Sequence, residues 1–586
     1  MRHVFQNPQC STLNRVVESS LLHRMVVWVS AMRVMCQFLL GGWMSTLAEP
    51  TTVSAPAPAS SPKPAAAPTH VFNARLMVGL LGILIASLAS GLNDRVTDIA
   101  SVDWRGQIGM GHDEGTWIAA VYEAGEVAGM MISAWFAVTL SFRRFAVGVS
   151  VAFAALAVVF PFVSDYGTLL ALRVVQGGVG GLLPPLLMTA ALRFLPPKIK
   201  LYGMSAYALT ATFGPNLATP LAALWTDTVG WQFVYWQVIP PCLLAALLMG
   251  WGLPQDPVRL ERFRQFDWRG VLSGCGGVAM LVLALEQGER LDWLASPLIC
   301  TLLICGTASL VLFFINEWNH PLPLFKLQML GRRNFAHGLL TLAGILIIFL
   351  SASMLPATYL AEVRGYRPLE IGPLALTIAI PQLVASPFAA MLCNIRWLDS
   401  RIVLATGLAL LLAACIGGSF LTDDWVRDNF YLLQAMHALG QPMTVLPVLM
   451  GATGAVQPPE GPFASAMFNT TRGMATVIGA AFVESLLTHR EHFHSNVLLD
   501  QIGRRVHLLA RSDILSRPNV LHLEPGRPMS GEGLGALAEQ IRSQALLMGV
   551  ADVYLVLGAM AVVLALVLVL LPQRTYPPGT DPRLTK

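Results

Sequence analysis

Long apolar segments follow one another along most of this chain, and they constrain its fold more than any other feature. A helix needs about 20 apolar residues to cross the roughly 30 Å hydrocarbon core of a bilayer. Of the 586 residues, 55% are hydrophobic and 12% are charged, and the mean hydropathy is +0.60, which is too apolar for a soluble protein. We therefore predict an all-α integral membrane protein with 14 transmembrane helices. The predicted spans are 75–97, 114–138, 145–164, 168–192, 202–224, 232–253, 270–285, 294–315, 335–359, 371–393, 402–421, 428–452, 463–487 and 548–571.

Basic residues in the short loops predict the direction in which the helices cross the membrane. With the N-terminus inside, the cytoplasmic loops hold 14 lysines and arginines, against five in the opposite short loops. Cytoplasmic loops carry such an excess, so we predict that both termini are cytoplasmic. The cytoplasmic residues are Arg143, Arg144, Arg193, Lys198, Lys200, Arg259, Arg262, Arg264, Arg269, Lys326, Arg332, Arg333, Arg396 and Arg401, and the opposite ones are Arg105, Arg290, Arg364, Arg367 and Arg427.

The two ends of the chain differ from the apolar region between them. Residues 51–69 form an Ala/Pro/Ser tract that cannot bury a core, so we predict a disordered cytoplasmic lead over 1–74. We hypothesise that translation starts at Met44, which would make residues 1–43 a mis-assigned start; the alternative is an amphipathic surface helix over Met25 to Leu47. Residues 572–586 are predicted to form a cytoplasmic tail.

Several functions are excluded by composition and spacing. The net charge of +4 is small and the basic residues are scattered, so we expect no nucleic-acid partner. The eight cysteines follow no metal-ligand spacing, and we expect no metal and no cofactor. One histidine-rich group follows the thirteenth span but fits no zinc pattern. Its members are His489, Glu491, His492 and His494.

A series of short motifs carries a family resemblance. GTWIAAVYEAGEV, SFRRF, LALRVVQGGVGG, ATFGPNLATP and GWQFVYWQVIP follow in order, and FNTTRGMATVIGAAF with THREHFHSNVL comes near the end. Together they resemble the fourteen-span drug/proton antiporters of the major facilitator superfamily, the EmrB/QacA type, and in particular the EmrB branch. The resemblance implies two six-helix bundles over 75–253 and 335–571, with a linker and an inserted helix pair over 254–334. It also implies a long periplasmic loop over 488–547.

Arg173 is the most unusual residue of the fourth span, because an arginine inside hydrocarbon costs at least about 2.5 kcal/mol. It matches the arginine of the family's R-x-x-q-G motif, with Gln176 and Gly177 in register. The resemblance implies an arginine that faces the bundle interior and acts on a proton-carrying carboxylate. The alternative is snorkelling to the external interface, which a depth of about 7 Å allows.

Four carboxylates are candidates for proton coupling: Asp94, Asp98, Glu123 and Glu126. Asp94 and Asp98 share one face of the first predicted span, and Glu123 and Glu126 share one face of the second. Glu126 lies closest to the middle of the membrane. Burial at that depth disfavours the charged form and an approaching Arg173 favours it, which is the balance that proton coupling requires. We therefore expect Glu126 to carry the proton, with Glu123 and Asp94 next. The alternative is a static buried ion pair with Arg173, Arg95 or one another.

Asp94 stands one position away from the aspartate of the family pattern, which falls where this chain has Leu92-Asn93. A shift of one residue turns a helix face by about 100°, so the family role of that aspartate does not transfer directly to Asp94.

The remaining candidates lie on three other segments. Gly214-Pro215 matches the centre of the family's antiporter motif and implies a kinked, closely packed helix; the alternative is an ordinary proline kink. Arg143 and Arg144 of SFRRF either act as conformational latches or are there only because cytoplasmic loops carry an excess of basic residues. In the thirteenth span, Asn469 and Arg472 are candidates for substrate binding or gating, with Arg472 near the middle of the membrane. These candidates complete the predicted site residues.

Together these features predict a proton-coupled secondary active exporter of amphipathic drugs or other toxic small molecules in the bacterial inner membrane, not an enzyme. The resemblance implies a periplasmic membrane-fusion adaptor and an outer-membrane channel as partners; loop 488–547 is either their docking surface or a linker. A facilitator or importer of a small metabolite is the alternative on the same fold. An integral membrane transferase is a further alternative, but its usual motifs are missing from the sequence.

Overall fold

The computed structural model describes residues 72–320, 322–457, 460–504 and 531–569, and every regular element in them is a helix. The predicted all-α fold is confirmed for this part of the chain. Met44, the lead up to residue 71 and the tail 572–586 lie outside the described residues. The α-helices are α2 (Ala74–Ile99), α3 (Ser101–Ile108), α4 (His112–Thr139), α5 (Phe142–Val159), α6 (Tyr166–Gly181), α7 (Leu183–Phe194), α8 (Lys200–Leu224), α9 (Phe233–Trp236), α10 (Ile239–Gly252), α11 (Trp268–Glu286), α12 (Pro297–Asn319), α13 (Arg333–Thr358), α14 (Pro368–Asn394), α15 (Ser400–Ser419), α16 (Tyr431–Gly454), α17 (Gly461–Arg504) and α19 (Gly531–Val569). Short helical segments are η2 (Phe160–Phe162), η3 (Trp225–Val229), η4 (Leu260–Gln265), η5 (Trp293–Ala295), η6 (Leu327–Gly331), η7 (Tyr359–Val363) and η8 (Arg427–Phe430).

Helices lie over all 14 predicted spans. In the described part of the chain, ten helical segments are long and apolar enough to cross a membrane by length and composition. Helices α4, α8, α16 and α17 are not among them. Each carries buried polar side chains that lower its hydropathy, for example Glu126 on α4 and Asn469 on α17. The count of 14 therefore stays a prediction.

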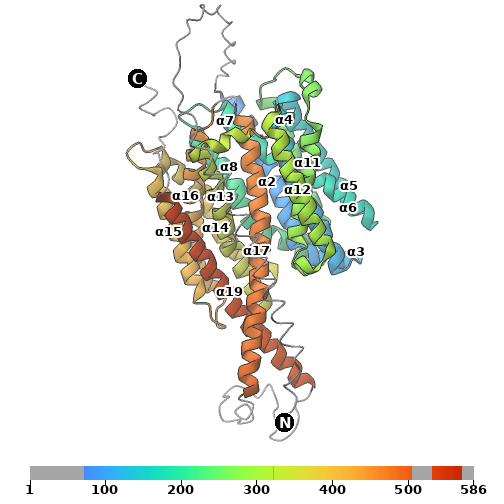
Figure 1. The fold of residues 1–586 in the computed structure, drawn as a ribbon, viewed down its shortest axis with the longest axis vertical. Coiled ribbons are helices and arrows are strands. Elements are labelled where there is room, and N and C mark those ends of the chain that lie inside the picture. The colour runs from blue at the N-terminus through green and yellow to red at the C-terminus, as the bar shows by residue number, and fades with distance from the viewer. Residues whose placement is uncertain (1–71, 321, 458–459, 505–530, 570–586) are drawn as a thin grey trace, which may run out of the picture. The chain divides into compact units, whose positions relative to one another are not determined.

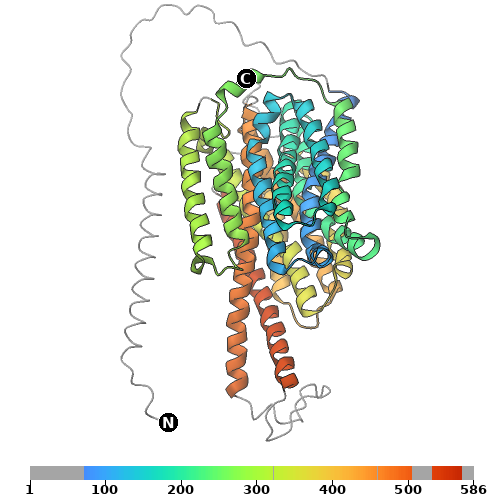
Figure 2. The ribbon, with the colours of Figure 1, turned by 90° about the vertical axis from the view of Figure 1, so that its right-hand side faces the viewer.

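The described helices form two groups with a pair beside them. Helices α2 to α10 pack against one another, as do α13 to α19, and the groups meet where α8 lies along α14 and α4 along α17. The pair α11 and α12 lies beside α4 and also contacts α17, as can be followed in Figures 1 and 2. Contacts join all of these helices into one compact unit, so the division at 253 and 335 stays a prediction.

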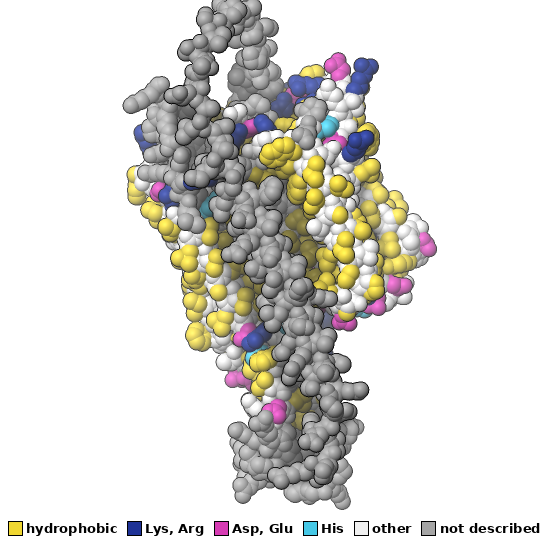
Figure 3. All heavy atoms as spheres, in the orientation of Figure 1, with side chains coloured by type: hydrophobic (Ala, Val, Ile, Leu, Met, Phe, Trp, Pro, Cys, Tyr) yellow, Lys and Arg dark blue, Asp and Glu magenta, His cyan; other side chains and the backbone are white. Residues whose placement is uncertain are grey.

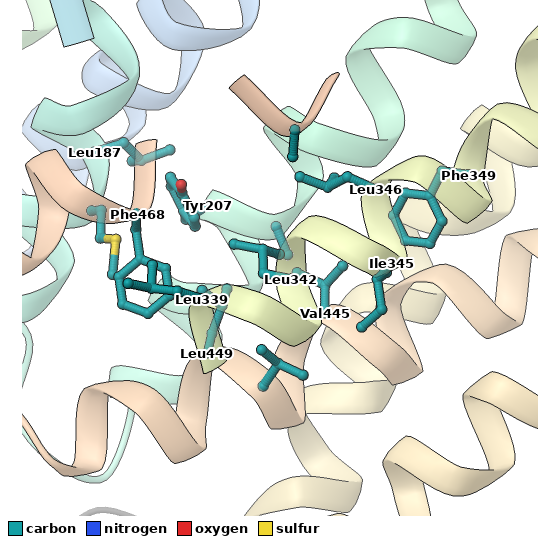
Figure 4. Close-up of a cluster of buried hydrophobic side chains, with 14 of the residues drawn as sticks. Leu187, Tyr207, Leu339, Leu342, Ile345, Leu346, Phe349, Val445, Leu449 and Phe468 are labelled. Carbon is teal, nitrogen blue, oxygen red and sulfur yellow. The ribbon is translucent and has the colours of Figure 1, made fainter. Parts of the chain in front are cut away.

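Apolar side chains fill the space where the two groups meet. Lipid tails are as apolar as these side chains, so close van der Waals packing between the helices stabilises the contact. Figure 4 shows this cluster, with Leu339, Leu342, Ile345, Leu346 and Phe349 of α13, Val445 and Leu449 of α16, Phe468 of α17, and Leu187 and Tyr207 from the first group.

Charged side chains separate toward the two ends of the helices. On the face drawn in Figure 3, lysines and arginines gather at the upper end, most acidic side chains lie lower, and hydrophobic side chains fill the band between. We call the end that holds Arg143, Arg193 and Arg332 the basic end. This separation follows the charge pattern on which the predicted orientation rests, and the orientation itself stays a prediction.

Helices α17 and α19 differ from the loop that was predicted over 488–547. Helix α17 continues to Arg504 and α19 begins at Gly531, and both project beyond the other helices in Figures 1 and 2. Side-chain bonds join them, because Arg490 Nη2 lies 2.5 Å and His494 Nε2 lies 2.7 Å from Asp552 Oδ2. The parts of the predicted loop at 488–504 and 531–547 are thus helical, and the periplasmic location of 488–547 stays a prediction.

Candidate functional site

Helices α4 and α6 approach each other closely enough to define the site between them. A Cβ at Gly177 would overlap the backbone oxygen of Tyr122, and one at Gly181 would overlap that of Glu126. Glycines four residues apart let membrane helices pack at backbone contact. Both helices have this spacing, and we did not predict its effect. The four glycines that face the other helix are Gly125, Gly129, Gly177 and Gly181.

The four predicted carboxylates lie near one another on α2 and α4, and we call them the acidic cluster. Arg95 links two of them: its Nη2 lies 3.9 Å from Glu123 Oε1, and its Nε lies 3.8 Å from Asp94 Oδ2. Glu126 is 8% exposed and interacts electrostatically with Asp94 and Glu123. Asp98 lies near the end of α2 and is exposed. The alternative of ion pairing with Arg95 therefore applies to Asp94 and Glu123.

Glu126 interacts with the second group of helices as well as with its own. Arg472 of α17 attracts Glu126 electrostatically and donates hydrogen bonds of 2.7 Å to both Oγ1 and the backbone oxygen of Thr210 on α8. Three residues earlier on α17, Asn469 Oδ1 accepts a hydrogen bond of 3.1 Å from Tyr207, also on α8. The two α17 residues singled out from the sequence thus both bond to the first group, beside its buried glutamate.

Arg173 lies in the interior, so the snorkelling alternative is wrong. Arg173 is only 1% exposed, and its Nη1 donates a hydrogen bond of 3.0 Å to Gln176 Oε1. Its guanidinium carbon lies 4.2 Å from the ring centre of Tyr122, 5.4 Å from that of Phe160 and 5.9 Å from that of Tyr235. Aromatic faces attract a desolvated cation, which explains how this charge is held inside the fold.

A cavity of about 160 Å³ lies beside Arg173 and Asp98, at the end opposite the basic end. Arg173 interacts electrostatically with Asp98, and its Nε has no hydrogen-bond partner among the described residues. A cavity of this size with polar walls can hold water. Of the four predicted carboxylates, Asp98 is thus the one that shares a cavity with Arg173 and interacts with it. The lining residues are Thr97, Asp98, Ser101, Trp104, Arg105, His112, Gly115, Thr116, Ala119 and Arg173.

Gly214 and Pro215 lie inside α8, but the close packing expected at Gly214 is not found. A Cβ at Gly214 would meet no atom within 4 Å. The close approach of α8 is further along, where Pro220 Cα would lie 3.3 Å from a Cβ at Gly372 of α14. The expectation of tight packing is wrong at Gly214 because the neighbouring helix meets α8 at a different point along its length.

Arg143 and Arg144 begin α5 at the basic end. Neither forms an ion pair within 4.0 Å with a described residue, and Arg144 lines an apolar groove of about 500 Å³ that lies away from the acidic cluster. An ion pair at this end joins Arg193 and Asp256, with hydrogen bonds of 2.7 and 2.9 Å. In the described part of the chain, the two arginines thus have no acidic partner within 4.0 Å that would form the latch.

A second charged group lies at the basic end, around Glu460, which precedes α17. Arg332 bonds to both carboxylate oxygens at 2.6 and 2.9 Å, and Lys326 Nζ lies 2.6 Å from Oε1. Burial alone would raise the pKa of Glu460, but the hydrogen bonds from Arg332, Lys326 and the backbone of Gln457 lower its pKa to about 2. These bonds tie the segment before α13 to the start of α17.

We expect Glu460→Gln to lower the thermal midpoint of the purified protein at pH 7, because it removes charge-assisted bonds that are each worth about 1.5–3 kcal/mol. A lowered pKa stabilises the fold above the ordinary value near 4.5. The difference between variant and wild type should therefore persist down to about pH 4.5 and shrink as the pH falls toward 2. The check is a thermal-unfolding series in detergent, with the exposed Glu261→Gln as control; a pH-independent difference would contradict the assignment.

The histidine-rich group lies on the projecting part of α17. His494 bonds to Asp552, and His489 Nδ1 lies 2.7 Å from the backbone oxygen of Ser485. Among the described residues, no group of three or more His, Cys, Asp or Glu side chains is placed to hold a metal ion. Glu491 pairs instead with Arg542 at 3.4 Å.

A buried polar layer in the second group was not predicted. His437 is 1% exposed and its Nε2 lies 3.3 Å from Ser351 Oγ. Gln382 donates to Gln441 at 2.5 Å, and Gln434 donates to the backbone oxygen of Ala352 at 2.9 Å. Residues 434, 437 and 441 of α16 have helical spacing, so the sequence carried a signal for this layer: three polar residues on one face of an apolar helix.

Comparison with known proteins agrees with this description. The profile of the Major Facilitator Superfamily matches residues 83–352. The multidrug export protein EmrB of Escherichia coli K12 is 24% identical over 440 residues, which covers 73% of this chain and 84% of EmrB. The probable multidrug resistance protein EmrY of the same strain is 23% identical, covering 75% and 85%. The proton:xylose symporter XylE has a similar fold, with a TM-score of 0.50, 14% identity and coverage of 86% and 97%.

The profile match and the export proteins among the relatives indicate a transporter rather than an enzyme. Both agree with the family resemblance that the motifs predicted: this chain is similar to the major facilitator superfamily and, within it, to the EmrB and EmrY export proteins.

Proposed function

We propose that this protein is a proton-coupled exporter of amphipathic drugs and similar toxic molecules. The observation that carries the proposal is the position of Glu126, a carboxylate 8% exposed that interacts both with the acidic cluster and with Arg472 of the second group. The names of EmrB and EmrY, which refer to multidrug export and multidrug resistance, support the class of substrate.

The position of Glu126 suggests how protonation and movement are coupled. When Glu126 is ionised, it attracts Arg472, which is bonded to Thr210. When Glu126 takes up a proton, that attraction is lost and the contact between α4 and α17 weakens. A proton that binds better in one arrangement of the two groups than in the other shifts the equilibrium between them. Alternation between the arrangements is what moves a substrate across the membrane.

The environment of the site fits the direction proposed. In the proposed orientation, which the charge pattern supports, the basic end is cytoplasmic and the cavity at Asp98 faces the outer side of the bacterial inner membrane. Protons enter there and drive export. A periplasmic adaptor and an outer-membrane channel are proposed partners, and the projecting α17 and α19 are their proposed contact.

The proposal is tested by dye transport in everted membrane vesicles, with ethidium as the probe. Respiration acidifies the vesicle lumen, and wild-type protein should then accumulate ethidium until nigericin collapses the pH gradient. We expect Glu126→Gln to reduce gradient-driven accumulation by at least about tenfold, because its side chain cannot exchange a proton. Glu261→Gln serves as a matched control, since Glu261 is exposed and remote from the acidic cluster.

Each outcome separates the candidate functions. Equal coupling in Glu126→Gln and wild type would remove Glu126 as the proton carrier. Ethidium equilibration that nigericin does not affect would indicate a facilitator, and the same assay with a panel of other dyes would extend that result beyond one probe.

A further inference from the structure

Glu286, the last residue of α11, brings a carboxyl group from the inserted pair to the acidic cluster. Helix α11 packs along α4, and the carboxyl groups of Glu286 and Glu123 are hydrogen-bonded to each other. A hydrogen bond between two carboxyl groups requires a proton on one of them, because an ionised carboxylate can only accept. The pair therefore holds at least one proton and carries at most one negative charge.

Charged residues of α2 and α4 surround this pair. Arg95 and Asp98 of α2 interact electrostatically with Glu286, as does Glu123 of α4. Arg95 lies 3.9 Å from Glu123, so it can neutralise the single negative charge that the pair keeps. These are the charged groups of α2 and α4 that act most strongly on Glu286. Glu484 of α17 interacts with Asp98 one step further out.

A route for protons leads to this pair from the cavity opposite the basic end. Asp98 lines that cavity and interacts with Glu286. The same cavity is lined by Arg173, which is buried and whose Nε has no hydrogen-bond partner in the described residues. An unpartnered buried donor at a polar cavity is a place for a water molecule. Water in the cavity can therefore reach Asp98, from which a proton can pass to Glu286.

The turn that follows Glu286 is attached to both groups of helices. Burial opposes the ionised form of Glu289, but hydrogen bonds from Trp293, and from Ser485 and Thr488 of α17, outweigh it and lower its pKa. Arg290 of the same turn lies 3.2 Å from Asp113 of α4. A relative movement of α4 and α17 must therefore strain or release the turn that holds Glu286.

We propose that Glu286 passes protons between the cavity at Asp98 and the Glu123–Glu126 part of the acidic cluster. The inserted helix pair is then a part of the proton path, in addition to being a structural element. In the first step, the O–H bond of protonated Glu286 breaks, its proton forms a new O–H bond on the Glu123 carboxylate, and Glu286 becomes a carboxylate. In the second step, that carboxylate accepts a proton from hydronium in the cavity or from a protonated Asp98, which becomes water or a carboxylate. One proton enters and one leaves Glu286, so no other reactant is needed. The inference rests on the proposed function.

The test compares Glu286→Gln with wild type in proteoliposomes, with ethidium as the probe. Glutamine keeps the size of the side chain and can still donate to Glu123, but it cannot release a proton. We expect transport driven by a pH gradient to fall by at least about tenfold. Exchange of internal for external ethidium at equal pH requires no net proton movement and should change by less than about twofold. Glu261→Gln, from the linker before α11, should match wild type in both assays.

A second measurement needs no substrate. N,N′-Dicyclohexylcarbodiimide modifies protonated carboxyl groups in apolar surroundings, and peptide mass spectrometry locates the modified residues. We expect modification within the Glu123–Glu286 pair at neutral pH, a changed extent at Glu123 in Glu286→Gln, and none at exposed Glu261. An equal thermal midpoint of variant and wild type shows that the variant is folded.

The outcomes distinguish this inference from the proposed function. If wild type shows gradient-driven transport and Glu286→Gln shows the same rate, the relay role of Glu286 is overturned and the proposed function stands. No gradient-driven transport by wild type would overturn the proposed function and the relay role with it, even if the carbodiimide modifies the pair. Parallel losses of gradient-driven transport and exchange would also overturn the relay role, because they would show a general defect.

Discussion

Replacing Gly181 with alanine should remove most of the folded protein, because α4 and α6 could no longer pack. The added Cβ would overlap the backbone oxygen of Glu126. Overpacking a core usually costs about 1–3 kcal/mol; here the obstacle is backbone, which cannot rotate away, so we expect a loss at or above the upper end of that range. Gel filtration of the detergent-extracted protein measures the folded fraction, and the thermal midpoint of any remaining protein measures its stability.

Gly148→Ala is the matched control for this substitution. Gly148 lies inside α5, and a Cβ there would meet no atom within 4 Å. Alanine is the better helix former, so this variant should purify in wild-type amount with an equal or higher thermal midpoint. Wild-type behaviour of Gly181→Ala would show that α4 and α6 are further apart than described, and it would remove the basis for the position of Glu126.

The positions of the helices could be predicted because each span leaves a local record in the sequence. A run of apolar residues of the necessary length predicts a helix regardless of its neighbours. The same holds for pairs on one helix: Asp94 and Asp98, or Glu123 and Glu126, were predicted to share a face. The structure adds the partners across helices, of which Arg95 with Glu123 is the clearest example.

Contacts between distant segments account for what was not predicted. Glu286 ends α11, and helices α5 to α10 separate it in the sequence from Glu123 on α4. Periodicity within one helix does not predict which other helix will pack against that helix. The expectation of close packing at Gly214 failed for the same reason. The glycines of α4 and α6 are different, since their four-residue spacing on both helices is a readable signal of close approach. The predicted span 463–487 covers only part of helix α17, because the apolar run stops there although the helix continues to Arg504.

Replacing Arg173 with alanine should nearly abolish transport and destabilise the fold. The guanidinium lies over Tyr122 at 4.2 Å and bonds to Gln176 at 3.0 Å. A desolvated cation–π contact is worth about 2 kcal/mol or more, and the variant would leave the buried Gln176 without its hydrogen-bond donor. We also expect Arg173→Lys to be inactive although it keeps the charge, because an ammonium group cannot stack or hold the fork of bonds that a guanidinium makes. Ethidium accumulation per folded molecule, with the thermal midpoint of each variant, measures both effects.

The two Arg173 variants separate the charge from its placement. If Arg173→Ala and Arg173→Lys both fold and both lose at least about tenfold in gradient-driven transport, the placed guanidinium beside Asp98 is needed for coupling. Full activity of Arg173→Lys would show that a positive charge in the cavity is sufficient, and full activity of both would remove Arg173 from the site. Arg264→Ala is the matched control, because Arg264 is exposed on η4 and forms no ion pair within 4.0 Å with a described residue. Its transport should equal that of wild type, since no described carboxylate within 4.0 Å depends on its charge.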